Sequence, residues 1–260
     1  MMIFDTHAHL NDPRFDEDRD EVIRGCFDEN IGLIVNIGCC LESSYDSVAL
    51  AKQYPGVYAA VGVHPHSADE MTEESFAEIK ALAKEEKVCA IGEIGLDYYY
   101  DNSERETQKY WFDRQLSYAA EIGMPVVIHN RDAHKDCMDI LRRYDLKESS
   151  GVVHCFSGSV EIAREVLKMG LYISIGGALT FKNANRLLQV ADAVPLSKIL
   201  LETDCPYLTP EPLRGKRNDP RKTIYVAQKL AEIKNVSVDE VVKTTMQNGC
   251  DLFRIKNPMQ

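Results

Sequence analysis

The chain has 260 residues, of which 45% are hydrophobic and 27% are charged. These fractions are typical of globular proteins and exclude a disordered, collagenous or coiled-coil chain. Lys and Arg number 30 against 41 Asp and Glu, so the formal charge is −11. An acidic chain is a poor candidate for tight, non-specific binding to duplex DNA, which needs many cations, although it can still hold a few phosphates at a metal site.

Eight short apolar segments recur along the chain at a regular spacing. Most of them are rich in Val and Ile, which is typical of strands buried on both faces of a parallel sheet. In chain order, these segments begin near Met2, Leu33, Val57, Val88, Pro125, Val152, Leu171 and Lys198.

Segments with the helical spacing of apolar residues lie between these strands. Pro220 is expected as the first residue of a helix that continues over 223–234, because its fixed φ suits the first helical turn. Ser237 with Glu240 predicts a capping box at the start of a final helix. The other predicted helices cover residues 16–30, 104–122, 132–144, 160–169 and 183–194.

Eight strands that alternate with eight or more helices indicate a (β/α)8 barrel, and the chain length suits that fold. A doubly wound open sheet is the alternative. That fold usually carries a glycine-rich phosphate loop after the first strand, and here His7-Ala8-His9 occupies the place. No linker, repeat or low-complexity segment is apparent. We therefore expect an α/β protein, a TIM-like barrel with an extra C-terminal helix, as a single domain over residues 1–260.

The cysteines indicate a reducing compartment. None of the eight forms a Cys-x-x-Cys pair, and several lie within apolar runs, so we expect reduced core thiols in a cytoplasmic protein. The N-terminal residues lack the basic and apolar regions of a signal peptide. No apolar run approaches the roughly 18 residues of a membrane helix.

Histidines and carboxylates gather at the ends of the predicted strands. Six of the seven histidines lie at or just past such an end, and the carboxylates Glu93 and Asp204 are placed at the ends of the fourth and eighth strands. In a barrel these ends meet on one face, where active sites of this fold lie. The six histidines are His7, His9, His64, His66, His129 and His154.

Four of these imidazoles and the two carboxylates predict a metal centre. His7 and His9 point the same way from an extended strand, and Asp5 shares their parity and could orient an imidazole. Six ligands are too many for one catalytic zinc but suit two ions about 3.5–4 Å apart. One ion is assigned to His7, His9 and Asp204, and the other to His129 and His154, with Glu93 as the bridging ligand.

The same residue types also have ordinary structural explanations. A lone His-x-His motif is weak evidence for a metal, and a single strand-end histidine is usually held by packing and hydrogen bonds. For His64, turn packing beside Pro65 and substrate contact are equally good explanations, whereas packing is favoured for His66. His134 begins a predicted helix and is expected at the surface. The joint pattern, not any one residue, favours the metal centre.

The chain resembles the TatD family of metal-dependent deoxyribonucleases, in the wider amidohydrolase-like barrel superfamily. The matching strings run in family order from residue 4 to residue 220: FDTHAHL (4–10), GVHPH (62–66), IGEIGLDY (91–98), VIHNRDA (127–133), HCFSG (154–158), LETDCPYL (201–208) and RGKRNDP (214–220). The resemblance covers essentially the whole chain. It implies a TIM-like barrel, a divalent two-metal site with the six ligands already grouped, and hydrolysis of DNA. Ala8, Asn130 and Cys205 depart from residues common in relatives, which bears on substrate preference more than on chemistry.

The substrate side is less sharply defined. Arg214, Lys216 and Arg217, beside Asn218, form a basic cluster in the loop after the last strand, and Arg131 follows a predicted ligand. Beside a metal centre these cations favour phosphate capture, although a solvated loop is the ordinary explanation. Tyr98-Tyr99-Tyr100 could stack on a nucleobase or simply pack at the rim. So few cations and aromatics favour contact with one or two terminal nucleotides.

The prediction is therefore a 3′–5′ exonuclease for single-stranded or frayed DNA ends, in which Asp204 accepts the proton of water with Glu202 behind it. Zn, Mn, Co, Ni or Fe suit the mixed ligands, and Mg could serve during turnover. DNA ends are the expected partner, with no membrane and no obligate protein partner.

Two other functions remain open. One is a carbon-centred hydrolase, such as a lactonase, an amidase or a deacylase of aminoacyl-tRNA. Many barrel relatives of that kind use a carboxylated lysine where Glu93 stands, which argues against those subfamilies but not against ester hydrolysis. The other is a non-enzymatic interaction protein with a vestigial site, which the complete ligand set disfavours.

Overall fold

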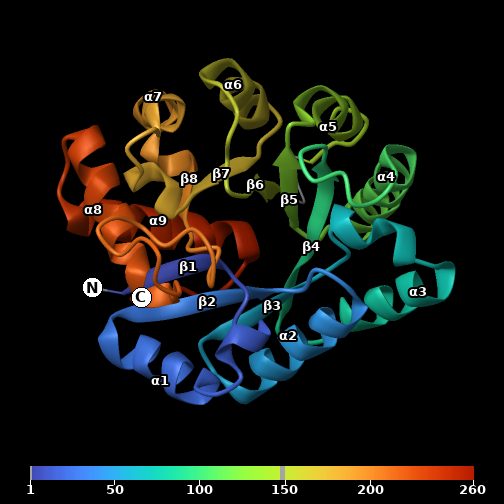
Figure 1. Cartoon of the computed structure of the whole chain (residues 1–260), viewed down its shortest axis with the longest axis horizontal. Helices are drawn as coiled ribbons and strands as arrows, with labels where there is room; N and C mark the ends of the chain where they lie inside the picture. Colours follow the sequence, from blue (N-terminus) through green and yellow to red (C-terminus); the bar gives the residue numbers. More distant parts are fainter. Residues whose placement is uncertain (1, 147–149) are drawn as a thin grey trace. The chain divides into compact units, whose positions relative to one another are not determined.

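A computed structural model describes residues 2–146 and 150–260, and its strands and helices alternate along the chain (Figure 1). The eight strands follow chain order in one sheet, and the pairs with a described register are parallel. All eight predicted strands are present, each beginning within two residues of its predicted start. The strands are β1 Ile3–Ala8, β2 Ile31–Ile37, β3 Val57–Val61, β4 Val88–Asp97, β5 Val126–Arg131, β6 Gly151–Val153, β7 Tyr172–Ile175 and β8 Ile199–Leu201.

Nine α-helices occupy the described residues. Seven correspond to predicted segments, whereas α2 and α3 were not among the predicted ranges. Predicted and observed helix ends differ by at most three residues. Short 3-10 turns lie ahead of two helices: Pro13–Phe15 before α1, and Pro220–Lys222 directly before α8. The helices are α1 Arg19–Glu29, α2 Leu41–Gln53, α3 Glu73–Leu82, α4 Arg105–Ile122, α5 His134–Leu141, α6 Val160–Lys168, α7 Asn185–Ala193, α8 Thr223–Lys234 and α9 Val238–Phe253.

The chain divides into two compact units. Unit 1 comprises residues 2–36, Cys155–Arg164 and Ile173–Gln260, and unit 2 comprises Ile37–His154 and Glu165–Tyr172. The single-domain organisation stays a prediction.

Unit 1 joins the first strand to the last. The hydroxyl of Thr6 donates to the carbonyl of Leu201 at 2.9 Å, and Ala8 forms a parallel bridge with Cys205 beyond the end of β8. Helices α8 and α9, orange to red in Figure 1, pack on one another and on β1. Ser237 caps α9 as predicted, because its side chain accepts from the N–H of Glu240. The carboxyl ends of β1 and β8 therefore lie together.

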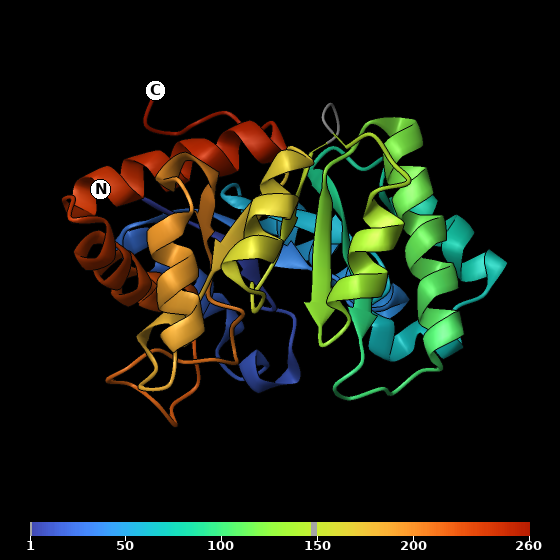
Figure 2. The ribbon, with the colours of Figure 1, turned by 90° about the horizontal axis from the view of Figure 1, so that it is seen from above.

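Unit 2 is built on the parallel strands β3, β4 and β5. Helix α4 packs against β4 and beside α5; both helices are green in Figure 2. The buried amide of Gln108 on α4 accepts from the N–H of Asp97 at 2.9 Å, and Gln115 accepts from the N–H of Val63 at 2.8 Å. These side chains supply hydrogen-bond partners where the strands end, so the segments after β3 and β4 are held firmly.

One glycine allows β4 and β5 to approach closely. Gly95 has φ +147, and a Cβ on it would lie 1.9 Å from the carbonyl oxygen of its strand partner His129. Only glycine fits such a position. Glu93 lies within β4 rather than at its end, contrary to the predicted placement, because the strand continues to Asp97.

All eight cysteines lie within the described residues, and each is a thiol rather than half of a disulfide, in agreement with the predicted reduced state. Five are buried, and burial raises the pKa of Cys26 and Cys137 to about 12. The other three, Cys39, Cys40 and Cys155, are only partly buried. Within the described residues, no helix is both long enough and apolar enough to span a membrane. The cytoplasmic location stays a prediction.

Candidate metal centre

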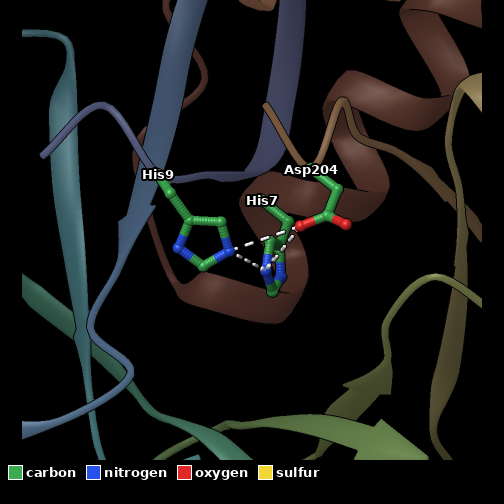
Figure 3. Close-up of side chains that lie close together, drawn as sticks. All are labelled: His7, His9 and Asp204. Carbon is green, nitrogen blue, oxygen red and sulfur yellow. Dashed lines mark hydrogen bonds and ion pairs between the residues drawn. The ribbon is translucent and has the colours of Figure 1, made fainter. Parts of the chain in front are cut away.

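Three predicted ligands form a compact group in unit 1, here called the first cluster: His7, His9 and Asp204 (Figure 3). The Nε2 atoms of His7 and His9 are 3.1 Å apart. Asp204 Oδ1 lies 3.7 Å from His7 Nε2 and 3.3 Å from His9 Nε2. Two imidazole nitrogens and one carboxylate oxygen thus converge on one point, as the sequence predicted for this set.

Backbone pairing beyond the ends of β1 and β8 brings these three side chains together. The N–H of Asp204 donates to the carbonyl of His7, and the N–H of His9 donates to the carbonyl of Cys205, both at 2.9 Å. Asp204 itself has φ +54, in the left-handed region that Asp tolerates better than most residues. The turn at Asp204 therefore depends on support from its neighbours.

Two buried side chains supply that support. Asp5 accepts from the N–H of Thr203 at 2.9 Å, from its hydroxyl, and from the N–H of His7 at 3.3 Å. Burial raises the pKa of Asp5 to about 8. The amide of Asn218 donates to the carbonyls of Thr203 and Tyr207, one on each side of Asp204. Asp5 thus contacts the His7 backbone, whereas the sequence suggested that it orients an imidazole.

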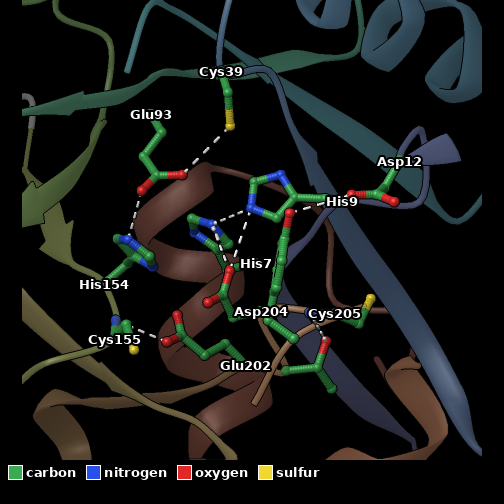
Figure 4. Close-up of polar contacts among 12 residues, drawn as sticks. His7, His9, Asp12, Cys39, Glu93, His154, Cys155, Glu202, Asp204 and Cys205 are labelled. Carbon is green, nitrogen blue, oxygen red and sulfur yellow. Dashed lines mark hydrogen bonds and ion pairs between the residues drawn. The ribbon is translucent and has the colours of Figure 1, made fainter. Parts of the chain in front are cut away.

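The second cluster lies in unit 2 and consists of Glu93, His129 and His154. Glu93 Oε1 is 2.8 Å from His129 Nδ1 and 2.7 Å from His154 Nε2, and these two nitrogens are 3.2 Å apart. Figure 4 shows Glu93 between His154 and Cys39, whose thiol lies 3.7 Å from Glu93 Oε2. All three residues are buried or nearly so, and all three are predicted ligands.

Asp97 is a residue that the sequence reasoning did not single out. Its Oδ2 lies 3.1 Å from His129 Nε2 and 2.9 Å from His66 Nε2. Burial by itself would raise the pKa of Asp97, but the hydrogen bonds from His129 and the Tyr100 N–H outweigh it and lower the pKa. The ionised carboxylate accepts a hydrogen bond from the Nε2–H of His129. Nδ1 of that ring therefore faces Glu93 and His154, the other two candidate ligands of the second cluster. The available signal was parity, since Asp97 lies four residues after Glu93 on one strand.

His64 faces the second cluster as a hydrogen-bond donor. Its Nδ1 accepts from the N–H of His66 at 3.1 Å, so the neutral ring carries its proton on Nε2, 3.5 Å from Glu93 Oε1. Burial, together with the neighbouring His129, holds the pKa of His64 well below its usual value. His66, for which packing was favoured, pairs with Asp97. His134 is half-buried, and its Nδ1 lies 2.9 Å from the Asn130 amide nitrogen.

The donor chemistry of both clusters fits divalent cations. Each cluster combines two imidazoles with one carboxylate, and carboxylate–imidazole sets of this kind bind Zn and its neighbours in the first transition series. Burial alone would lower the pKa of His129, but the hydrogen bonds to Asp97 and Glu93 outweigh it and raise the pKa. The second cluster therefore favours positive charge. The carboxylate behind His129 is the usual partner of a metal-binding histidine.

Glu202 precedes Asp204 by two residues in the sequence. Its side chain is buried and accepts two hydrogen bonds within unit 1. Its Oε1 accepts from the N–H of Cys155 at 2.7 Å (Figure 4), and its Oε2 accepts from the hydroxyl of Ser174. Both carboxylate oxygens thus contact protein donors. This arrangement suits a residue that positions the chain around the carboxyl ends of β7 and β8.

The predicted aromatic and cationic residues of unit 2 have different surroundings. Tyr98 is only partly exposed, because its hydroxyl donates to Asp136 at 2.8 Å and Arg105 covers its ring at 4.2 Å. The guanidinium of Arg131 instead lies 4.0 Å from the ring centre of the exposed Tyr99. Tyr98 is therefore the least accessible tyrosine of the run.

The loop after β8 likewise separates its predicted residues. Arg217 forms a bidentate ion pair with Asp18 and also donates to the carbonyl of Arg14. Asn218 is fully buried and supports the Asp204 turn. Arg214 is exposed, stacks on Phe181 at 4.0 Å and donates one bond to the carbonyl of Thr209. Of these three, Arg214 has the geometry most open to a ligand.

Comparisons with known proteins agree with this geometry. A family model described as "TatD related DNase" matches residues 4–254. The uncharacterized metal-dependent hydrolase YabD of Bacillus subtilis is 45% identical over 254 residues, which cover 98% of this chain and 100% of that protein. The 3′-5′ ssDNA/RNA exonuclease TatD of Cronobacter sakazakii is 35% identical over 260 residues, 98% of each chain. The crystal structure of YjjV, a TatD homologue from Escherichia coli K12, has a TM-score of 0.92 at 31% identity and covers 98% of both chains.

The fold and the two donor clusters define a metal-dependent hydrolase built on a (β/α)8 barrel, which confirms the predicted fold class and enzyme class. The chain belongs to the TatD-related DNase family. The resemblance read from the motif strings is thereby confirmed over nearly the whole sequence.

Proposed function

We propose that this chain is a two-metal 3′–5′ exonuclease that removes nucleotides from single-stranded or frayed DNA ends. The observation that carries the proposal is the pair of three-donor clusters, each with two imidazoles and one carboxylate. The 35% identity to the ssDNA/RNA exonuclease of Cronobacter sakazakii supports a nucleic acid as the substrate.

Each cluster would hold one divalent ion. His7, His9 and Asp204 would bind one, and Glu93, His129 and His154 would bind the other. That Glu93 serves both ions stays a prediction. Zn, Mn, Co, Ni or Fe match these ligands best, with Mg as a further candidate during turnover. Divalent ions, when bound, supply positive charge next to phosphate oxygens and make water a better acid.

The chemical step is hydrolysis of the last phosphodiester. Water adds to phosphorus and the bond from phosphorus to the 3′ oxygen of the preceding nucleotide breaks. A 5′-mononucleotide leaves, and the 3′ oxygen takes up a proton from solvent to become the new 3′ hydroxyl of the shortened strand. Asp204, whose side chain is 17% exposed, would accept the proton of the attacking water. Glu202 would act behind it by holding the backbone of Cys155 in place.

Substrate residues follow from exposure and charge. His64 would donate its Nε2–H to a substrate oxygen that lies next to Glu93. Arg131 and Arg214 would donate to phosphate oxygens. Tyr98, Arg217 and Asn218 were also predicted to bind substrate. Each of these side chains bonds another part of the protein, namely Asp136, Asp18 and the Thr203 carbonyl, which favours a structural role in addition to binding.

The test is a time course of single-stranded oligonucleotide cleavage. The protein is stripped of metal and resupplied with Mg or Mn, and the strand carries a label at either its 5′ or its 3′ end. A ladder that shortens a 5′-labelled strand, needs metal and disappears in Glu93→Ala would support the proposal. Parallel DNA and RNA strands separate the two substrates.

His134→Ala is the matched control, because this histidine contacts Asn130 and belongs to neither cluster. It should retain the ladder. Binding of two ions without cleavage of any strand would overturn the proposal, most clearly if the same protein hydrolyses simple esters, lactones or aminoacyl-tRNA.

A further inference from the structure

Two exposed tyrosines follow strand β4 and differ from the other exposed tyrosines of the described chain. Tyr99 and Tyr100 are 59% and 54% exposed, with their rings edge to face at 4.9 Å. The other exposed tyrosines each have a hydroxyl bonded to a carboxylate: Tyr45 to Glu78, Tyr110 to Glu73 and Tyr207 to Asp12. Over residues 2–146 and 150–260, the hydroxyls of Tyr99 and Tyr100 have no such partner. These two rings are exposed without being tethered.

Arg131, the last residue of β5, covers the pair. Its guanidinium lies 4.0 Å from the ring centre of Tyr99 and 4.7 Å from that of Tyr100. In the described part of the chain it forms no ion pair, although the protein carries eleven more acidic than basic residues. Arg105 and Arg217, by contrast, are bound to Asp101 and Asp18. The N–H groups of Arg131 are therefore available to a ligand.

Tyr99, Tyr100 and Arg131 are here called the stacking platform. The residue Asp97 joins this platform to the second cluster. Asp97 Oδ1 accepts the N–H groups of Tyr99 and Tyr100, at 3.0 and 2.9 Å. Asp97 Oδ2 faces His129 and His66, and the ring of His66 meets Tyr100 edge to face at 5.3 Å. Asp97 is also the strand partner of Arg131. The platform is thus held at a defined distance from a metal-binding imidazole.

The chemistry of the platform matches a nucleotide. Exposed tyrosine faces stack on bases without regard to sequence, and a stacked guanidinium presents its N–H edge to phosphate. We propose that the stacking platform binds the base and phosphate of the nucleotide next to the scissile bond of a single strand. This inference rests on the proposed function and names its substrate class: an unpaired polynucleotide end, because a base within a duplex cannot present its face.

Equilibrium binding of two fluorescent strands tests the platform. One is a ten-nucleotide oligothymidylate with phosphorothioate linkages at its 3′ end to slow hydrolysis. The other has abasic residues in place of its last three thymidines. Wild type should bind the first strand more tightly. Tyr99→Ala and Tyr100→Ala should each weaken that binding by roughly 5- to 100-fold, while binding of the abasic strand stays the same.

Matched variants separate stacking from charge. Tyr99→Phe keeps the ring and should bind both strands as wild type does, whereas Arg131→Ala should weaken both. Tyr45→Ala, which removes another exposed tyrosine, on α2, should change neither. Melting temperatures show whether each variant is folded. Equal binding of the two strands by wild type, or unchanged binding of the oligothymidylate by both alanine variants, would overturn the platform.

Wild-type hydrolysis of bis(p-nitrophenyl) phosphate, a small phosphodiester without a base, keeps the two claims apart. If this ester is hydrolysed while the oligothymidylate is not preferred, the platform is wrong and the metal phosphodiesterase stands. If neither the ester nor any strand is hydrolysed, the proposed function fails. Loss of the base preference in Tyr99→Ala and Tyr100→Ala would still support the platform as a binding site.

Discussion

The first cluster is held mainly through its backbone, whereas the second cluster is held through an imidazole ring. Asn218 and Asp5 bond main-chain groups around Asp204 and His7, and they determine where the chain turns. Asp97 also accepts two main-chain N–H groups through Oδ1, but its Oδ2 bonds the ring of His129 and determines which nitrogen of that ring carries the proton. Both clusters offer two imidazoles and one carboxylate, so they differ in support more than in ligand chemistry.

This difference separates stability from metal affinity. A lost bond to a buried carbonyl leaves that carbonyl without a donor, and its cost appears in the free energy of unfolding. A lost bond to an imidazole changes the tautomer and the orientation of a ligand, and its cost appears in metal binding. Substitution of Asn218 or Asp5, which support the first cluster, should therefore mainly lower the free energy of unfolding. Substitution of Asp97, which supports the second cluster, should mainly lower metal affinity.

The largest expected effect comes from removing a predicted ligand, because the affected cluster then no longer holds its ion and its mode of support no longer matters. His7→Ala and His129→Ala should each lower hydrolysis by about 1,000-fold or more, because one charged partner of the phosphate is lost. Bound metal should fall from two ions to one per chain, as measured by elemental analysis. His134→Ala should retain both ions. Two ions in both ligand variants would contradict the assignment.

The next effect isolates the ring support. In Asp97→Asn the side-chain amide donates to His129 Nε2, which forces the ring proton onto Nδ1, where a metal should bind. Metal affinity at the second cluster should fall by about 10- to 100-fold in a titration against a chelating dye. Asp101→Asn is the control, because Asp101 is an exposed carboxylate that pairs with Arg105 and belongs to neither cluster. An affinity equal to that of wild type would show that Asp97 does not set the tautomer.

The backbone support should behave in the opposite way. Asn218→Ala leaves the carbonyls of Thr203 and Tyr207 without their side-chain donor, so the free energy of unfolding should fall by about 1–3 kcal/mol. Urea denaturation measures this change, with the exposed Asn183→Ala as control. Metal affinity at the second cluster should stay constant. A variant as stable as wild type would remove the basis of the comparison.

The smallest effect concerns pH. Burial by itself would raise the pKa of Asp219, but the hydrogen bonds from Arg221 and Lys222 outweigh it and lower the pKa below 3.8. The folded chain therefore favours the ionised form. Its contribution to stability is complete above the unfolded value and is lost as the pH falls through the folded value. Unfolding measured between pH 6 and 3 should show a smaller acid-dependent loss in Asp219→Asn than in wild type.

The sequence by itself determined the order of the elements and was enough to group the candidate ligands. Buried parallel strands are continuous apolar runs, so their positions can be read without knowing their partners. The carboxyl ends of barrel strands share one face, so histidines at those ends could be grouped before any distance was known. In both groups predicted in this way, around Asp204 and around Glu93, the candidate ligand atoms lie within 3.7 Å of one another.

Only the tertiary structure decided which neighbouring groups act together. Arg217 and Arg131 look alike in sequence, yet Arg217 pairs with Asp18, 199 positions away, and Arg131 stacks on two tyrosines. The role of Asp97 depends on a strand pairing that places it beside His129. A local pattern records the periodicity of a segment but not its distant partners. Charge, tautomer and exposure are set by those partners, so they follow from the packed structure alone.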